Sequence, residues 1–565
     1  MRVHSAMRAA MSAVTIVITI AAGAFAPGHL GELTRVIPFD LVDAVLEEEG
    51  STERRLRLIP SRCGVYFLLA LALFPDCSYL GAWGKLTAAL RLRAPSESAL
   101  RNLRCRIGAR PLQRIFEILA GPLGRPRTPG IMFCGLRTVS FDGCKSVKVP
   151  DTSDNRAWLG KLKAVNGETG YPALMLMTLV ETGTRALLGA AFGPLAGGET
   201  GWAARLLHLL DESMLVLMDR GFDGGKFLAQ VAETKAQFIV RLTSNRRPPL
   251  LLPLPDGSFL SVIGGARVRI ITAAVTVTCH DGTSYSDSYR LATTLLDHRK
   301  YPATALIGLY HERWEHETAY LALRHTILKG RVLRSGTPAG IRQETWALLA
   351  LYQALRTAIA DAVQTVPGTD PDRAGWTIAV ETARNLTVTA ANITDPDGDL
   401  PGDIGRAVLA RLHGPRRPRV CARKVKSPLS RWNKHPAGKP RTTKRITAIT
   451  STVITAYRQS ARQRPQDPAP GEPAGTPGQA PAGHVASPDA GLAPAGPGTA
   501  AASPPRTPRQ RRPRPRSQPK RGVAPNPGNA VSDQANTHSR PASKKTKPAK
   551  PLDPAPKPLT ARHWH

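Results

Sequence analysis

The first third of the chain carries its apolar residues at helical spacing. LIPSRCGVYFLLALALF is apolar along nearly its whole length, which predicts a buried helix. PSESALRNLRCRIGARPLQRIFEILAG begins with a serine cap signal, and its apolar residues then recur about every 3.6 positions. We therefore expect an all-helical N-terminal domain over about 30–125. Its many arginines fit a face that binds duplex ends, and they fit an ordinary solvated face equally well.

From about residue 130 the pattern changes to short apolar runs. RTVSFDG and MLVLMDRGF each read as a strand that ends in an aspartate, Asp142 or Asp219, before a turn containing glycine. Strand ends in α/β folds are where side chains that face ligands collect. The alternative is that both are plain turn residues. The rival acids Asp151 and Asp154 lie in a PDTSDN loop, and Asp211 and Asp223 end no apolar strand.

A block rich in β-strand patterns lies between about 236 and 295. QFIVRLTS, ARVRIITAAVTVTCH and SYSDSYRLATTLL are β-branched and apolar, and DG and NRRPP supply turn signals. Helical patterns return with IRQETWALLALYQALRTAIADAV. The pattern therefore predicts an α/β domain over about 130–435 that a β-rich segment interrupts.

The two ends of the chain differ from the middle. Beyond about 458 the sequence is dense in Pro, Gly, Ala and basic residues, which cannot bury enough apolar surface to fold. We expect a disordered basic tail over 459–565 that adds nonspecific attraction to phosphates. Residues 1–29 form a leader with a short apolar run that resembles a signal peptide but is too short for a confident membrane span.

Net charge and cysteine content indicate which class of partner the protein binds and which cellular compartment it occupies. Lys and Arg number 77 against 42 Asp and Glu, a net charge of +35, which indicates a polyanionic partner such as nucleic acid. The seven cysteines are scattered without a C-x-x-C pair, which argues against a disulfide scaffold or a zinc ribbon and fits a reducing cytoplasm. An exported basic protein, cleaved near residue 26, is the competing possibility; we expect a cytoplasmic protein associated with the nucleoid, with no membrane partner.

The segment YHERWEHETAYLALRH at 310–325 places two histidines around glutamates. A zinc-protease helix needs its histidines four apart, so that they share one face. His311 and His316 are five apart, which on a helix turns them roughly 140° from each other. The spacing therefore argues against a zinc site.

Four other side chains of this segment do line up. Relative to Tyr310, the residues Arg313, Glu317 and Arg324 lie 3, 7 and 14 positions on, within roughly 60° of arc on a helix. A carboxylate can hold a metal ion, and the flanking arginines and tyrosine can hold phosphates. The alternative is a solvated face with i,i+4 salt bridges.

Taken together, Asp142 in SFDG, Asp219 in LMDRGF and Glu317 in YHERWEHE resemble the three acids of the DDE transposases of the insertion-sequence-four family. The hallmark of that family is Tyr, two residues, Arg, three residues, Glu, six residues, Lys. Tyr310, Arg313 and Glu317 match it, whereas Arg324 replaces the lysine. DGCKSVKVPDTSDN and VLRSGTPAGIRQETWALL also resemble family segments, although Cys144 stands where threonine is typical.

The resemblance, in colinear order over about 30–435, implies a fold and an activity. The fold is a ribonuclease-H-like α/β core with a β-rich insertion, since Asp219 and Glu317 are 98 positions apart, far more than such a core needs. The activity is binding of the insertion element's ends, followed by DNA strand cleavage and strand transfer. Asp142, Asp219 and Glu317 would be catalytic and would hold two Mg²⁺ ions, for which Mn²⁺ substitutes.

The resemblance also implies the partners. Tyr310, Arg313 and Arg324 would bind double-stranded DNA, both the terminal inverted repeats and the target, and the protein would act as a dimer in the DNA complex. The alternative is a catalytically decayed or domesticated derivative that binds DNA without cleaving it.

Overall fold

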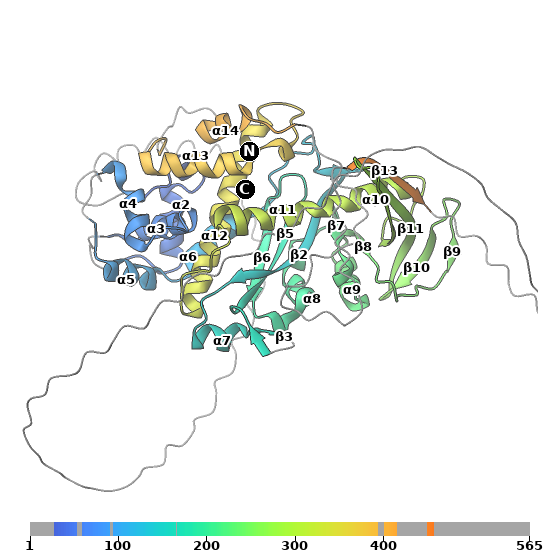
Figure 1. Cartoon of the computed structure of the whole chain (residues 1–565), viewed down its shortest axis with the longest axis horizontal. Coiled ribbons are helices and arrows are strands. Elements are labelled where there is room, and N and C mark those ends of the chain that lie inside the picture. The colour runs from blue at the N-terminus through green and yellow to red at the C-terminus, as the bar shows by residue number, and fades with distance from the viewer. Residues whose placement is uncertain are drawn as a thin grey trace, which may run out of the picture. The chain divides into compact units, whose positions relative to one another are not determined.

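The computed structural model describes residues 28–53, 59–90, 94–164, 167–393, 400–414 and 449–456 (Figure 1). Nearly all of the predicted leader and the whole predicted tail lie outside the described residues. Over the ranges that are described, no helix is both long and apolar enough to cross a membrane.

The region predicted to be helical contains five α-helices, two short 3₁₀ helices and no strand among its described residues. Ser96 caps one of them, its hydroxyl accepting from the backbone N–H of Ala99 at 3.2 Å. That helix ends at Gly108, whose φ of +70° is readily adopted by a residue without a side chain. The prediction of helices here is confirmed, with bounds α2 Phe39–Glu48, α3 Ser61–Leu73, α4 Tyr79–Leu86, α5 Glu97–Ile107 and α6 Arg110–Leu119.

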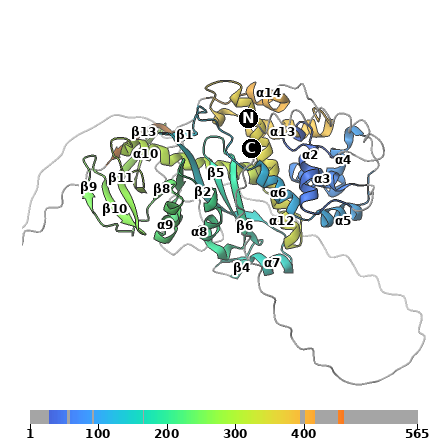
Figure 2. The ribbon, with the colours of Figure 1, turned by 180° about the vertical axis from the view of Figure 1, so that it is seen from behind.

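A large mixed sheet follows. Its strands lie in the order β6-β5-β2-β7-β8-β12-β11-β10-β9, with β1 on β2 and β13 on β11 (Figure 2). Strand β5 runs antiparallel to both β2 and β6, whereas β7 runs parallel to both β2 and β8. The first part of the sheet comprises β1 Met132–Phe133, β2 Leu136–Lys148, β5 Ala173–Glu181, β6 Leu187–Gly193, β7 Met214–Met218 and β8 Gln237–Arg241. A separate hairpin pairs β3 Leu162–Ala164 with β4 Gly167–Thr169.

Helices cover both faces of this sheet, and the side chains of β7 show how. Val216 and Met218 pack in one cluster with residues of α8 and α9. Leu215 and Leu217 point the other way and pack with residues of α10. Because both faces are covered, the strand is apolar at every position, as parallel strands usually are. The helices are α7 Ser153–Leu159, α8 Gly198–Ala203, α9 Gly225–Glu233, α10 Ala303–Tyr310 and α11 Trp314–Leu321.

The β-rich block extends the sheet rather than forming a separate one. Strand β12 pairs antiparallel with β8, and β11 and β12 form a hairpin that turns at Asp281 and Gly282, as the DG signal predicts. β8 lies inside the predicted block of 236–295, yet it is the parallel neighbour of β7. The added strands are β9 Leu252–Pro253, β10 Phe259–Ile263, β11 Ala266–Cys279 and β12 Ser284–Thr293, together with β13 Ile449–Ala456.

A long helix near the end of the described chain, α12 Pro338–Gln364, ties the N-terminal helices to the rest. Arg104 of α5 donates to Gln343 and Glu344 of α12, each at 3.0 Å and buried. Two further helices pack beside α12, namely α13 Trp376–Thr389 and α14 Gly402–Leu409.

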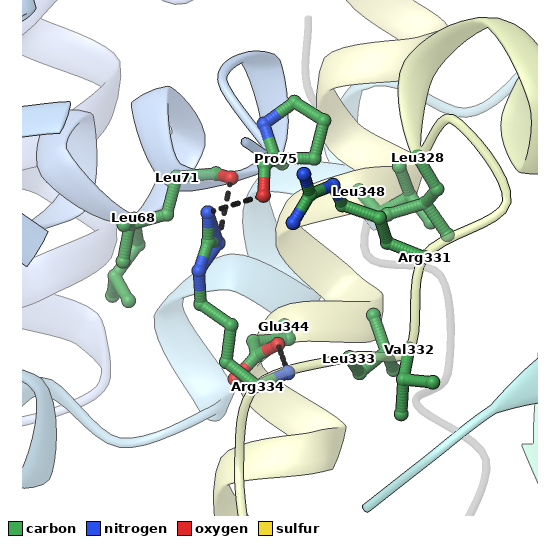
Figure 3. Close-up of a pocket in the computed structure, with 11 residues that line it drawn as sticks. Leu68, Leu71, Pro75, Leu328, Arg331, Val332, Leu333, Arg334, Glu344 and Leu348 are labelled. Atoms are coloured by element: carbon green, nitrogen blue, oxygen red, sulfur yellow. Dashed lines mark hydrogen bonds between the residues drawn. The ribbon is translucent and has the colours of Figure 1, made fainter. Parts of the chain in front are cut away.

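A second cross-connection surrounds a cavity of about 30 Å³ between α3 and the segment before α12 (Figure 3). The guanidinium of Arg334 points at the end of α3 and donates to the carbonyls of Leu71, Phe74, Pro75 and Cys77 at 2.8–3.1 Å. Leu71 lies in the last turn of α3 and the other three residues follow that helix directly, so the arginine caps α3. The cavity has room for a water or two and no more, so it is a packing feature and not a ligand site.

Candidate active site

Asp142 lies in the middle of β2, so the prediction that it ends a strand is wrong. β2 continues to Lys148, and Asp142 and Gly143 pair with Thr178 and Met177 of β5. The strand that ends near Asp142 is β7, which pairs with β2 on the side opposite β5. The parallel pairing of β2 with β7 stops at Ser140. Asp142 is therefore at an edge that β2 exposes beyond its shorter partner.

Asp219 comes directly after β7, as predicted. Ser140 of β2 lies opposite Leu217 of β7, so two further steps along both parallel strands bring Asp142 opposite Asp219. An Asp219 oxygen accepts from the backbone N–H of Gly221 at 2.7 Å, which turns the chain away from the sheet. The two aspartates therefore emerge side by side from neighbouring strands.

The segment that carries Glu317 is helical but is not one regular helix. Between α10 and α11, residues His311–Arg313 form a 3₁₀ turn, and after α11 residues Ala322–Ile327 form a π-helical turn. The prediction of one shared face for these four side chains assumed a regular helix, and the 3₁₀ and π turns change the angle between successive side chains in opposite senses. Tyr310 and Arg313 are buried, Glu317 is partly exposed, and Arg324 lies in the π turn.

Arg313 lies between the predicted acids. Its guanidinium is 3.6 Å from a carboxylate oxygen of Asp142 and 3.8 Å from one of Glu317. The pKa of the Asp142 carboxyl is raised to about 7 by burial and by the charges of Asp219 and Glu317, although Arg313 opposes the rise. Burial acts to lower the pKa of Arg313, but Tyr310 and the three acids together hold it above its usual value. The three acids and Arg313 thus form one electrostatic unit.

His316 and Tyr320 attach α11 to the sheet beside Asp142. The imidazole of His316 is fully buried and hydrogen bonded to the hydroxyls of Ser140, at 2.9 Å, and Thr178, at 2.6 Å. Burial lowers the pKa of His316 to about 3, so the ring is neutral and can donate to one hydroxyl and accept from the other. The Tyr320 hydroxyl donates to the carbonyl of Asp142 at 2.7 Å. These contacts fix where the helix presents Glu317.

Replacing His316 by alanine is expected to lower the free energy of unfolding by about 1–3 kcal/mol, because buried hydroxyls lose their partner. The spacing of the two histidines argues only against a zinc site, and the burial of His316 gives its side chain a structural role. His325→Ala, at an exposed position of the same helical run, is the matched control and should change stability by less than about 0.5 kcal/mol. Equal denaturation midpoints for both variants would contradict this assignment.

Comparison with known proteins supplies the identity. Residues 27–117 match the family described as insertion element 4 transposase N-terminal, and residues 138–353 match the transposase DDE domain. The chain is 25% identical over 354 residues to the transposase InsG for insertion sequence element IS4 of Escherichia coli, covering 59% of this chain and 77% of that protein. The chain belongs to the insertion-sequence-four family of DDE transposases. It is therefore a DNA transposase, an enzyme that cleaves and transfers DNA strands.

Two further matches are weaker. The putative transposase InsZ of Escherichia coli is 27% identical over 128 residues, 22% of this transposase and 42% of that chain. A cryo-EM structure of a piggyBac transposase synaptic complex with hairpin DNA aligns over 67% of this chain and 86% of that one, at 10% identity and a TM-score of 0.34. That score is too low for the likeness to carry an argument.

A buried ion pair on the far side of α11 also holds the transposase helix in place. Arg185 donates to Glu315 at 2.5 Å and pairs with Asp372, and all three side chains are almost fully buried. The backbone carbonyl of Arg185 accepts from Tyr352 of α12 at 2.8 Å. Removing one partner of such a group leaves a buried charge uncompensated, which is costly. None of these residues stood out in the sequence.

The rival acids serve local structure in the transposase. Asp151 pairs with Lys161 at 2.8 Å, and Asp211 accepts from Ser213 at the turn before β7. Asp223 accepts from Thr243 and pairs with Arg246. Asp154 is an exposed residue of the first turn of α7.

The donor set of the transposase suits a hard divalent cation. Asp142, Asp219 and Glu317 offer only carboxylate oxygens, which Mg²⁺ and Mn²⁺ prefer. The raised pKa of Asp142 marks a carboxylate whose charge a cation would stabilise. Among the described residues no three His, Cys, Asp or Glu side chains already converge closely enough to hold an ion. The guanidinium of Arg313 lies among the acids instead.

Sequence reasoning missed one carboxylate at this site. Glu199, in the first turn of α8, pairs with Lys145 of β2 at 2.9 Å. It lies beside Gly143, the residue after Asp142, and beside Gly221, two residues after Asp219. Its segment, GPLAGGETGWA, has neither strand nor helix periodicity, so no sequence signal marked it.

Proposed function

We propose that this transposase cleaves and joins DNA at a ribonuclease-H-like core, in which Asp142, Asp219 and Glu317 are catalytic and hold two divalent ions. The observation that carries the proposal is the register of the parallel strands, which brings Asp142 opposite Asp219, together with the coupling of both to Glu317 through Arg313. A derivative that only binds DNA has no need of such an assembly of acids.

The strand order supports the fold assignment. An antiparallel meander of three strands, β2, β5 and β6, continues into two parallel strands, β7 and β8, on the other side of β2. This arrangement is what a ribonuclease-H-like core requires. We place the start of the β-rich insertion after β8, because β8 completes the parallel part.

The chemistry follows from the donor set. Asp142, Asp219 and Glu317 would hold two divalent ions, which would supply activation of a water or a 3′ hydroxyl and stabilisation of the leaving oxygen, with no need of a covalent protein intermediate. We assign Mg²⁺, with Mn²⁺ as a substitute, to carboxylates that offer hard oxygens. His316 and Tyr320 hold α11 against β2 and β5, so that Glu317 stays beside the two aspartates.

DNA binding rests on charge. The net charge of +35 favours phosphate contacts along the protein. We assign recognition of the terminal inverted repeats to the N-terminal helices of residues 30–125, phosphate binding near the site to Tyr310, Arg313 and Arg324, and nonspecific attraction to the tail of 459–565. We expect a dimer in the complex with element ends and target DNA, acting in the cytoplasm at the nucleoid.

The function is tested with the DNA that flanks the reading frame. Purified full-length protein should nick duplexes carrying the flanking inverted repeats when Mg²⁺ or Mn²⁺ is present. Chelation with EDTA should stop nicking but leave binding, because phosphate contacts do not need the metal. Binding without nicking under either metal would favour the decayed derivative.

A further inference from the structure

Glu199 is held between the segments that follow two of the candidate catalytic acids. A Cβ at Gly221 would lie 3.0 Å from a Glu199 oxygen and 2.9 Å from an Asp219 oxygen, so these two oxygens are at most about 6 Å apart. A Cβ at Gly143 would lie 2.9 Å from Cγ of Glu199. Any side chain at either glycine would therefore press on the Glu199 side chain. The two glycines leave the space that this carboxylate occupies.

The partner of Glu199 is a cation from the strand that carries Asp142. Lys145 lies three residues after Asp142 on β2, and its ammonium is 2.9 Å from the Glu199 carboxylate. The Lys145 side chain is about half exposed, whereas that of Glu199 is 26% exposed. An exposed lysine in such a pair contributes little to stability and is easily displaced by a stronger cation.

A second cation, the guanidinium of Arg313, lies in the same group of acids, although burial disfavours a charged side chain there. The Arg313 side chain is 10% exposed beside Asp142 and Glu317, and its Nε has no hydrogen-bond partner. A buried donor is left unpaired only at a cost. The acids therefore hold two cationic side chains, one on the side of Glu317 and one on the side of Glu199.

We propose that Glu199 is a fourth carboxylate of the metal site, holding a divalent ion together with Asp219, and that the Lys145 ammonium takes the place of this ion until it binds. The inference rests on the proposed assignment of Asp219 as a metal ligand. Two carboxylate oxygens at most about 6 Å apart can close on one ion by small side-chain rotations, since each lies about 2.0–2.2 Å from a bound Mg²⁺ or Mn²⁺.

The test measures the affinity of the full-length protein for Mn²⁺ in the absence of DNA. The electron paramagnetic resonance signal of free Mn²⁺ reports how much of the ion remains unbound. Glu199→Gln should weaken binding by at least about tenfold, the loss produced even by removing a group that only orients a ligand. Lys145→Met should tighten binding severalfold, because the competing ammonium is gone. Glu212→Gln, an exposed glutamate at the opposite end of β7, removes the same charge and should change nothing.

The possible outcomes separate this inference from the proposed function. If Asp219→Asn weakens Mn²⁺ binding while Glu199→Gln and Lys145→Met do not alter it, Glu199 only holds the lysine and the inference is overturned. If Asp219→Asn also has no effect, the proposed metal site itself is wrong. Should Glu199→Gln fail to fold, Lys145→Met alone decides, since unchanged affinity in that variant contradicts competition for Glu199.

Discussion

Asp142→Asn, Asp219→Asn and Glu317→Gln are each expected to reduce strand cleavage by on the order of 10³-fold or more, while binding of element ends changes little. Each change keeps the size of the side chain and removes the charge that would hold a metal ion, which contributes several kcal/mol to stabilising the reaction's transition state. The N-terminal helices and the overall charge of +35 remain, so phosphate attraction persists.

The measurement pairs a nicking assay on terminal DNA in Mg²⁺ with a binding titration at fixed salt. Asp151→Asn is the matched control, because Asp151 is an acid on the same stretch of chain that pairs with Lys161 on the surface. It should cleave at the wild-type rate. Cleavage retained by any one of the three site variants would remove that residue from the site.

Arg313→Ala is expected to have the second large effect, a loss in the rate of strand cleavage on the order of 10²-fold or more. Arg313 lies within 4 Å of both Asp142 and Glu317, so its loss disturbs the placing of two acids as well as any phosphate contact. Overall affinity for DNA should fall only slightly, since many other basic groups bind phosphates. The assays are again nicking and binding on the same terminal DNA.

Two substitutions frame that result. Arg324→Lys introduces the lysine of the family pattern at a partly exposed position in the π turn, and cleavage should be unaffected. Arg313→Lys keeps the charge but not the planar fork, and should fall between wild type and Arg313→Ala. Wild-type cleavage by Arg313→Ala would show that the guanidinium has no part in the reaction.

The position of Asp219 at a strand end was predictable from the sequence because it follows a strong local pattern. MLVLM is apolar at every position, which fixes a buried parallel strand and makes the following Asp219 conspicuous. The end of β2 was misjudged because SFDGCKSVK has Asp and Gly at its centre, residues that usually mark turns. Pairing with β5 keeps that segment extended, and such pairing is a long-range effect.

Other features depend on packing that no local pattern reveals. The 3₁₀ and π turns around α11 occur in HERWEHETAYLALRHTI, which contains neither Gly nor Pro to mark them. The burial of His316 against Ser140 and Thr178 joins residues more than 130 positions apart. The position of Glu199 beside Asp219 likewise arises only when α8 packs on the sheet.

The pairing of β12 with β8 moves one free edge of the sheet away from β2 and β7, the strands beside which Asp142 and Asp219 lie. Without the insertion, β8 would expose an unpaired row of backbone donors and acceptors one strand from β7, a template for pairing with other chains. With it, the outer strands on this side are β9, only two residues long and containing Pro253, and β13, which pairs with β11. We therefore expect a variant that lacks β9–β12 to expose the edge of β8 and to aggregate more readily than the full chain.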